Sequence, residues 1–102
     1  MIYLDHNATT PIDERVLDAM LPFLTTFYGN PSSLYRQGRV ARSAIETARE
    51  QVASLVGAQP AQVIFTSGGT EANNLALAAG GSETGLAISA IEHPSIAEPA
   101  QR

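Results

Sequence analysis

Cysteine and lysine are both absent from the 102 residues of this chain. Without cysteine there is no disulfide framework, no thiolate nucleophile and no thiolate metal site. Without lysine, these residues can form neither a Walker A phosphate loop nor a Schiff base with a carbonyl compound. Long apolar runs are missing too, and the start of the chain has no basic region. We therefore expect no signal peptide and no membrane span, and a cytoplasmic protein.

Acidic residues outnumber basic ones, which gives a net charge of -4. This balance argues against nucleic acid and against an acidic membrane as partners. The basic residues are all arginines, and four of them lie between Arg36 and Arg49. We interpret them as a solvated helix face or a subunit contact. We expect no metal site, because His6, His93 and the scattered carboxylates lack any motif spacing.

The first half of the chain shows helical periodicity. Asp13 is placed to cap a first helix, and a longer helix is predicted over residues 35–56, with Gly57 as its C-terminal cap. Turn-forming residues occupy positions 29–33 between the two helices. The positions of the longer helix that we expect to be buried are Val40, Ala41, Ala44, Ile45, Ala48, Val52 and Leu55.

The second half alternates between strand and helix patterns. Short apolar runs predict strands over residues 63–66 and 86–91, separated by a helix over 71–79 that ends at Gly80, Gly81 and Ser82. A last helix is expected to open at His93 and Pro94. Strand, helix and strand with a short crossover predict a parallel pair and an α/β architecture. Because buried parallel sheets need more strands than two, we expect the front part of a larger protein.

The turn between the first predicted strand and the next helix is the main candidate site. Backbone N–H groups and the helix dipole meet there and favour an anion such as phosphate. Ser67 and Thr70 offer hydroxyl donors, and Gly68 and Gly69 allow close approach to the backbone. The alternative is an ordinary turn capped by Ser67 or Thr70, with Glu71 as a capping-region acid. The pattern is not the G-x-G-x-x-G dinucleotide fingerprint.

His93 closes the second predicted strand. Ligands of parallel sheets bind outside the carboxyl ends of the strands, so we expect Gly69, Thr70 and His93 on one rim. An imidazole there can stack on an aromatic ligand or transfer protons near neutral pH. The alternative is a histidine that only starts the last helix.

Four blocks of sequence occur in a fixed order: YLDHNATTP at 3–11, GNPSS at 29–33, FTSGGTEANN at 65–74 and EHP at 92–94. Together they resemble the cysteine desulfurases of the NifS/IscS type, which belong to the class V aminotransferases. The resemblance extends over nearly the whole chain and covers only the N-terminal portion of the family's length.

This resemblance implies a pyridoxal-phosphate-dependent homodimer of fold type I, with three αβα layers and a mainly parallel sheet. Residues 1–30 would form an N-terminal segment with the first helix, and residues 31–102 would begin the cofactor-binding large domain. Members of the family convert L-cysteine to L-alanine. They deliver persulfide sulfur to an acceptor protein, an Fe–S scaffold or a sulfur carrier.

Site roles are also implied by position. Gly69 and Thr70 would bind the phosphate of pyridoxal phosphate, and His93 would stack on its pyridine ring and assist proton transfer. The loop at residues 30–33 would lie near the dimer-related site. Three further residues would line the mouth of the active site, namely Asn7, Ala8 and Thr9.

Some expected features are absent or altered. Tyr35 stands where many members of the family have a histidine. The family's Schiff-base lysine, its pyridinium-pairing aspartate, its substrate-binding arginine and its sulfur-accepting cysteine are expected beyond residue 102. These residues alone should therefore be inactive. Two alternatives remain: another class V enzyme such as a selenocysteine lyase, or a short non-catalytic protein that pairs through open strand edges.

Overall fold

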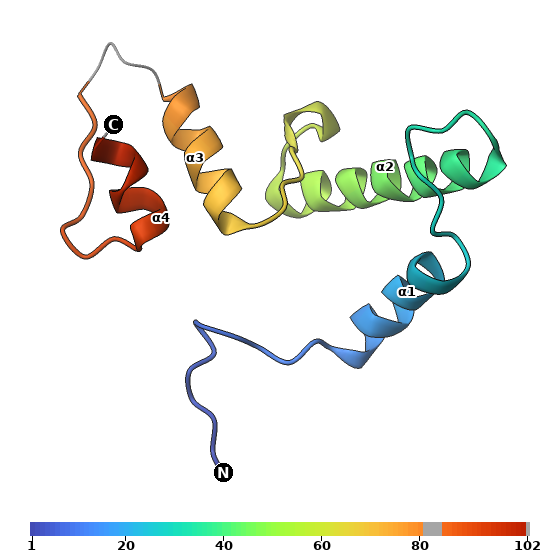
Figure 1. The fold of residues 1–102 in the computed structure, drawn as a ribbon, viewed down its shortest axis with the longest axis horizontal. Coiled ribbons are helices and arrows are strands. Elements are labelled where there is room, and N and C mark those ends of the chain that lie inside the picture. The colour runs from blue at the N-terminus through green and yellow to red at the C-terminus, as the bar shows by residue number, and fades with distance from the viewer. Residues whose placement is uncertain (81–84, 102) are drawn as a thin grey trace. The chain divides into compact units, whose positions relative to one another are not determined.

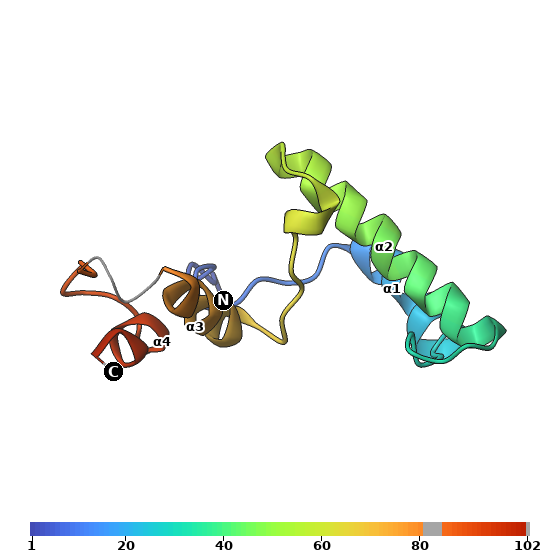
Figure 2. The same ribbon diagram turned by 90° about the horizontal axis from the view of Figure 1, so that it is seen from above.

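The computed structural model describes residues 1–80 and 85–101, which divide into two compact units, Met1–Val63 and Ile64–Arg102. Figures 1 and 2 show the elements of each unit. The elements in the described residues are α1 (Glu14–Thr25), α2 (Arg36–Val56), η1 (Pro60–Gln62), α3 (Gly69–Ala79), α4 (Pro94–Ala97) and η2 (Pro99–Gln101). The predicted domain boundary at residue 30 concerns the whole protein and stays a prediction. None of the helices in these residues is long and apolar enough to cross a membrane.

Helix α1 starts where the capping pattern predicts. The Asp13 carboxylate accepts a hydrogen bond from the Arg15 backbone N–H at 2.9 Å and forms an ion pair with the Arg15 guanidinium at 2.7 Å. These contacts satisfy a first-turn donor that has no partner within the helix. The hydrogen bond from the Arg15 side chain is also the main cause that lowers the pKa of Asp13 below its usual value.

A tight turn precedes α2 and packs against its first turn. The Asn30 side chain accepts from the Ser32 N–H, and the Asn30 carbonyl accepts from the Ser33 N–H, both at 2.9 Å. Gly38 is buried beneath this turn. A Cβ at Gly38 would lie 2.5 Å from the Asn30 carbonyl oxygen and closer still to that of Ser33. Only glycine therefore lets the turn approach α2 this closely.

The C-terminal end of α2 confirms the predicted Gly57 cap. Gly57 has a φ of 69°, and the next residue, Ala58, donates its N–H to the Ala53 carbonyl at 2.9 Å. Beyond it, Arg49 of α2 donates to the Val63 carbonyl and to Glu46, which ties the end of the first unit to the helix. At least one member of the arginine cluster is thus structural.

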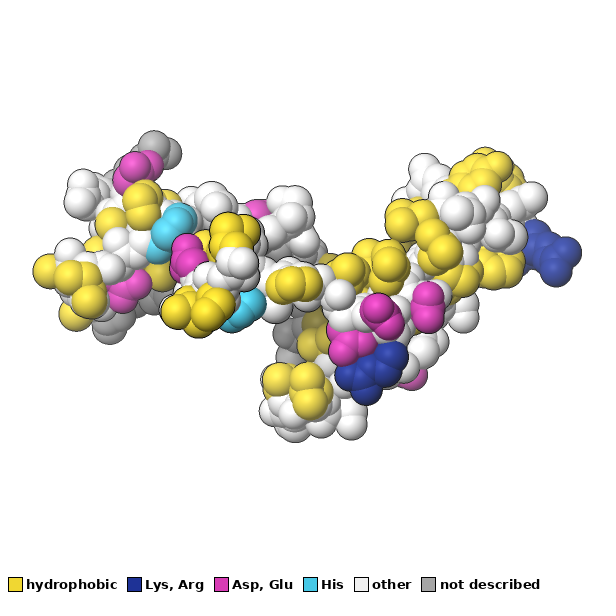
Figure 3. Space-filling view, turned by 90° about the horizontal axis from the view of Figure 1, so that it is seen from below, with side chains coloured by type: hydrophobic (Ala, Val, Ile, Leu, Met, Phe, Trp, Pro, Cys, Tyr) yellow, Lys and Arg dark blue, Asp and Glu magenta, His cyan; other side chains and the backbone are white. Residues whose placement is uncertain are grey.

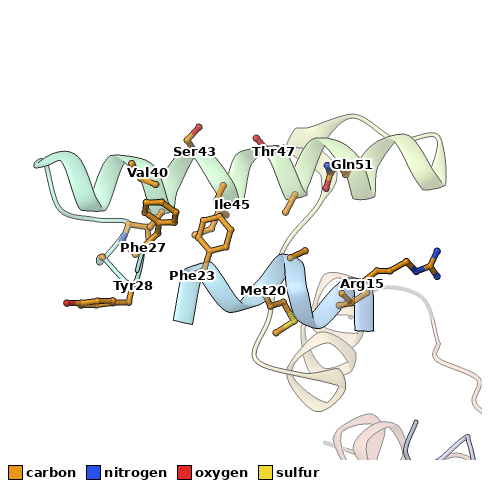
Figure 4. A pocket seen from close by; sticks show the side chains of 17 residues that line it. Arg15, Met20, Phe23, Phe27, Tyr28, Val40, Ser43, Ile45, Thr47 and Gln51 are labelled. Carbon is orange, nitrogen blue, oxygen red and sulfur yellow. The ribbon is translucent and has the colours of Figure 1, made fainter. Parts of the chain in front are cut away.

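The apolar stripe of α2 is less buried than predicted. Its first five positions are half-buried, whereas Val52 and Leu55 are 40% and 85% exposed. Within the described residues, Ala53 is the one buried hydrophobic residue. An open apolar groove of about 1300 Å³ separates α1 from α2, and Phe23, Phe27 and Ile45 contribute to its lining (Figure 4). Hydrophobic side chains show at the surface over both units (Figure 3). The reason is that the residues the structure describes form no sheet layer to cover these helix faces.

The prediction of two strands is wrong for the described residues. Residues 63–66 have no regular secondary structure, and neither do 86–89, which run into a turn at 90–91. In that turn the Ser89 hydroxyl accepts from the Ile91 N–H at 3.3 Å. A strand satisfies its backbone groups only by pairing, and a short apolar run gains no ladder without neighbouring strands.

The second unit is built around α3. This helix begins at Gly69, two residues earlier than predicted, and it packs against α4 and η2. Its end at Gly80 is as predicted, since Gly80 donates its N–H to the Ala76 carbonyl at 3.1 Å. Gly81 and Ser82, the rest of the predicted break, lie outside the described residues. The predicted start of the last helix at Pro94 is confirmed.

Candidate functional site

The N-terminus of α3 presents backbone donors without a side-chain cap. Gly68 is the N-cap residue and has no side chain to accept from the first turn, so within the described residues the N–H groups of that turn have no side-chain partner. The backbone of Gly68 is fully extended, with φ 169° and ψ -178°. A Cβ at Gly68 or Gly69 would meet no atom within 4 Å. The space beside this backbone is therefore open as far as the described residues are concerned.

Ser67 is not a free hydroxyl donor, contrary to expectation. Its hydroxyl and its backbone N–H both donate to the Glu71 carboxylate, at 2.6 and 2.7 Å. The hydrogen bond from the Ser67 hydroxyl, followed by that from its N–H, lowers the pKa of Glu71. Glu71 is thus the capping-region acid of the alternative interpretation.

Thr70 keeps its hydroxyl available. Among the described residues, no hydrogen bond engages this hydroxyl, and the Thr70 carbonyl accepts from the Asn74 side chain at 2.8 Å. The sequence suggested two hydroxyls as hydrogen-bond donors to an anion, and the Thr70 hydroxyl is the one that remains available.

His93 caps α4 through one ring nitrogen. Its Nδ1 accepts from the Ser95 backbone N–H at 3.1 Å and lies 2.9 Å from the Ser95 hydroxyl oxygen. The alternative interpretation, a histidine that starts a helix, therefore accounts for the contacts of Nδ1. Among the described residues no hydrogen bond engages Nε2, whose in-plane bonding direction diverges from that of Nδ1.

Thr70 and His93 line the same cavity, of about 380 Å³. The packing of α3 against α4 brings them together, whereas the expected reason was the shared rim of two strands. Gly69 precedes Thr70 in the chain and is not part of the cavity lining. The remaining lining residues are Asn74, Pro94, Ser95, Glu98 and Pro99.

Two residues at this site were not found from the sequence. The Asn73 amide donates to the Ser95 hydroxyl oxygen at 2.9 Å, and both residues are half-buried. A polar residue on the inner side of a helix is a signal for such a bond, but its partner is 22 positions away.

The other predicted site residues belong to the first unit. Asn7 and Ala8 lie in a turn that Thr9 follows, and in this turn the Asp5 carbonyl accepts from the Ala8 N–H at 3.1 Å. A hydrogen bond between the Tyr3 and Thr9 hydroxyls closes the turn. Their place at an active-site mouth stays a prediction. In the described part of the chain, no three His, Asp or Glu side chains form a group able to hold a metal ion.

The family model of the class-V aminotransferases matches residues 2–102. The chain belongs to this family. The chain is similar to the mitochondrial cysteine desulfurase of Drosophila melanogaster, 62% identical over 77 residues, which are 74% of this chain and 17% of that protein. The cysteine desulfurase of Frankia sp. is 50% identical, and the alignment covers 94% of this chain and 24% of that protein. Cysteine desulfurase IscS of Dictyoglomus turgidum is 46% identical, with 96% of this chain and 26% of the relative covered.

A solved structure of a NifS-like protein has the same fold over nearly all of this class-V chain. The TM-score is 0.84 and the identity 37%, and the match covers 98% of this chain and 29% of that one. The predicted fold, the N-terminal part of a pyridoxal-phosphate-dependent transferase, is thereby confirmed, although its strands do not form in the described residues. The chain spans about a quarter or less of the curated relatives it matches.

Proposed function

We propose that the protein carrying this sequence is a pyridoxal-phosphate-dependent cysteine desulfurase. It converts L-cysteine and an acceptor thiol into L-alanine and a persulfide, a reaction that balances without an external oxidant. The proposal is supported by identities of 46–62% to proteins named cysteine desulfurase. The structural observation that carries it is the cavity shared by Thr70 and His93 at the start of α3.

The donor set at α3 fits a phosphate group. Backbone N–H groups of the first turn, the Gly69 N–H among them, and the Thr70 hydroxyl can each donate to phosphate oxygens, and the helix dipole adds positive potential. Glu98 lines the same cavity and opposes an anion, but it is exposed, so solvent screens its charge. When bound, the cofactor supplies an electron sink for the substrate carbanion.

The role of His93 in this proposal is to support the cofactor ring and to move a proton. The Nδ1 contacts fix the orientation of the imidazole, and Nε2 is the nitrogen left to hold or pass on a proton. Asn7, Ala8 and Thr9 are proposed to line the mouth of the site in a cytoplasmic homodimer. The sulfur is proposed to go to an Fe–S scaffold or a sulfur carrier protein.

The test is a turnover assay with the whole protein. Purified protein supplied with pyridoxal phosphate and L-cysteine should release alanine, together with equimolar sulfide once a thiol reductant is present. A matched reaction with L-selenocysteine tests the selenocysteine lyase alternative, which predicts turnover of that substrate alone. Cofactor-loaded protein that forms no alanine would refute the proposal.

His93→Ala is the variant that tests the site. We expect a large loss of kcat while the thermal unfolding midpoint changes little, since the hydrogen bonds of the ring within the described residues go to Ser95 in the first turn of α4. Unchanged turnover in this variant would leave His93 with its capping role alone.

A further inference from the structure

Asn73 and Ser95 join the two helices that carry Thr70 and His93. The Asn73 amide donates to the Ser95 hydroxyl oxygen at 2.9 Å. Thr70 lies three residues before Asn73 and so shares a side of α3 with it. His93 lies two residues before Ser95. The bond therefore joins the two helices close to the positions of Thr70 and His93.

Hydrogen-bond directions along this contact determine the tautomer of His93. The Ser95 hydroxyl oxygen accepts from Asn73, which leaves its own hydrogen free to donate to Nδ1 at 2.9 Å. The Ser95 backbone N–H points to the same nitrogen at 3.1 Å. Two donors facing Nδ1 require that nitrogen to be an acceptor, and the ring proton of the neutral imidazole then resides on Nε2.

We infer that Asn73 and Ser95 are positioning residues that hold His93 as the Nε2–H tautomer at the cavity it shares with Thr70. The significance of this for catalysis rests on the proposed function, because a defined proton position matters only where His93 meets a cofactor or substrate. The tautomer itself is a property of this chain's own residues and is measurable without turnover.

Helix capping alone does not account for Asn73. A histidine that merely starts α4 needs the Ser95 N–H and gains nothing from an amide on α3. Under that interpretation, Asn73→Ala leaves the tautomer unchanged. Under ours, it frees the Ser95 hydroxyl to rotate and accept, so the Nδ1–H form becomes more populated.

The experiment uses the whole protein, free of cofactor, with 15N-labelled histidine rings. Long-range 1H–15N correlation spectra report which ring nitrogen carries the proton at a pH where the ring is neutral. The His93 signals are assigned by their loss in His93→Gln. We expect Nε2–H in the unmodified protein. In Ser95→Ala and Asn73→Ala, the tautomer ratio should shift toward Nδ1–H by about three- to tenfold, the factor for one uncharged hydrogen bond.

Three further variants make the test selective. Asn73→Asp replaces the donor with a carboxylate that draws the Ser95 hydroxyl hydrogen away from Nδ1, so the same shift is expected without loss of side-chain volume. Ser95→Thr keeps the hydroxyl and should retain the Nε2–H tautomer of the unmodified protein. Ser89→Ala removes a hydroxyl of the same kind from a separate turn and should have no effect.

The double variant Asn73→Ala/Ser95→Ala should shift the ratio no further than Ser95→Ala, because both residues act along one path. A tautomer ratio unchanged in Ser95→Ala, Asn73→Ala and Asn73→Asp would overturn the inference, whatever their activity. A shifted ratio in a protein that does not turn over L-cysteine would support the inference and refute the proposed function. The two failures are therefore distinguishable.

Discussion

Gly38 is the position in the first unit where adding a methyl group should destabilise the structure most. The Asn30 and Ser33 carbonyl oxygens both lie within 2.5 Å of the place a Cβ would take, and the Ser33 Cβ lies at 2.8 Å. Ordinary carbon–oxygen contacts lie well beyond 3 Å. Because the obstructing atoms are mostly backbone, they have no rotamer that relieves the overlap.

The magnitude follows from two opposing effects. Alanine is a better helix former than glycine by about 1 kcal/mol. Forcing an extra group into a closed space costs roughly 1–3 kcal/mol, and more when backbone must move. With two backbone oxygens in the way, we expect the overlap to win and Gly38→Ala to destabilise the protein by about 1–2 kcal/mol. The turn at residues 30–33 should be displaced from α2.

The measurement is hydrogen exchange by mass spectrometry on the whole protein, supported by thermal unfolding. In Gly38→Ala, amides of residues 29–40 should exchange faster, while those near Ala53 keep their rates. Gly85→Ala is the matched control, since a Cβ there meets nothing within 4 Å. Equal or slower exchange over residues 29–40 in Gly38→Ala would show that the turn does not pack on this glycine and would refute the prediction.

Three more predictions concern the two helix starts. Thr70→Ala should weaken cofactor retention by roughly 1–3 kcal/mol, the loss of a hydrogen bond to a charged group, as measured by equilibrium dialysis of pyridoxal phosphate; unchanged retention would return Thr70 to a purely structural role. Because the pKa of Glu71 is lowered, its carboxylate stabilises the folded state fully above its usual pKa of 4.5. This stabilisation is lost as the pH falls through the lower pKa of the folded state. Glu71→Gln should therefore flatten the acid side of the plot of stability against pH. The same sign holds for Asp13, whose pKa is lowered from 3.8 by Arg15. Asp13→Asn should keep the helix cap but remove part of the loss of stability below that pH, as measured by urea unfolding. An unchanged loss of stability at acid pH in this variant would contradict the prediction.

Local signals in the sequence predicted the helices well. The start of α1 at Asp13 and the ends at Gly57 and Gly80 each depend on contacts within a few residues, which a sequence displays directly. The strands over 63–66 and 86–91 were predicted from local apolar runs, but a strand exists only through its neighbours. That prediction therefore failed where the partners were not among the described residues.

The candidate site was predicted in part, and for a different reason than the one observed. Thr70 and His93 do line one cavity, but the packing of α3 on α4 places them there. The hydroxyl of Ser67 was expected to face an anion and instead donates to Glu71. The bond between Asn73 and Ser95 could not be predicted, because no local sequence pattern in either segment indicates a partner in the other.

The Glu71 carboxylate gives α3 an internal anion of its own. It already offsets part of the positive potential at the helix start, through contacts to Ser67 at 2.6 and 2.7 Å. A phosphate arriving there gains less from long-range attraction than it would at a bare helix end. Retention must then depend on directed donors, and we expect it to vary little with ionic strength. The helix start would thus favour groups that accept several hydrogen bonds over groups that only carry charge.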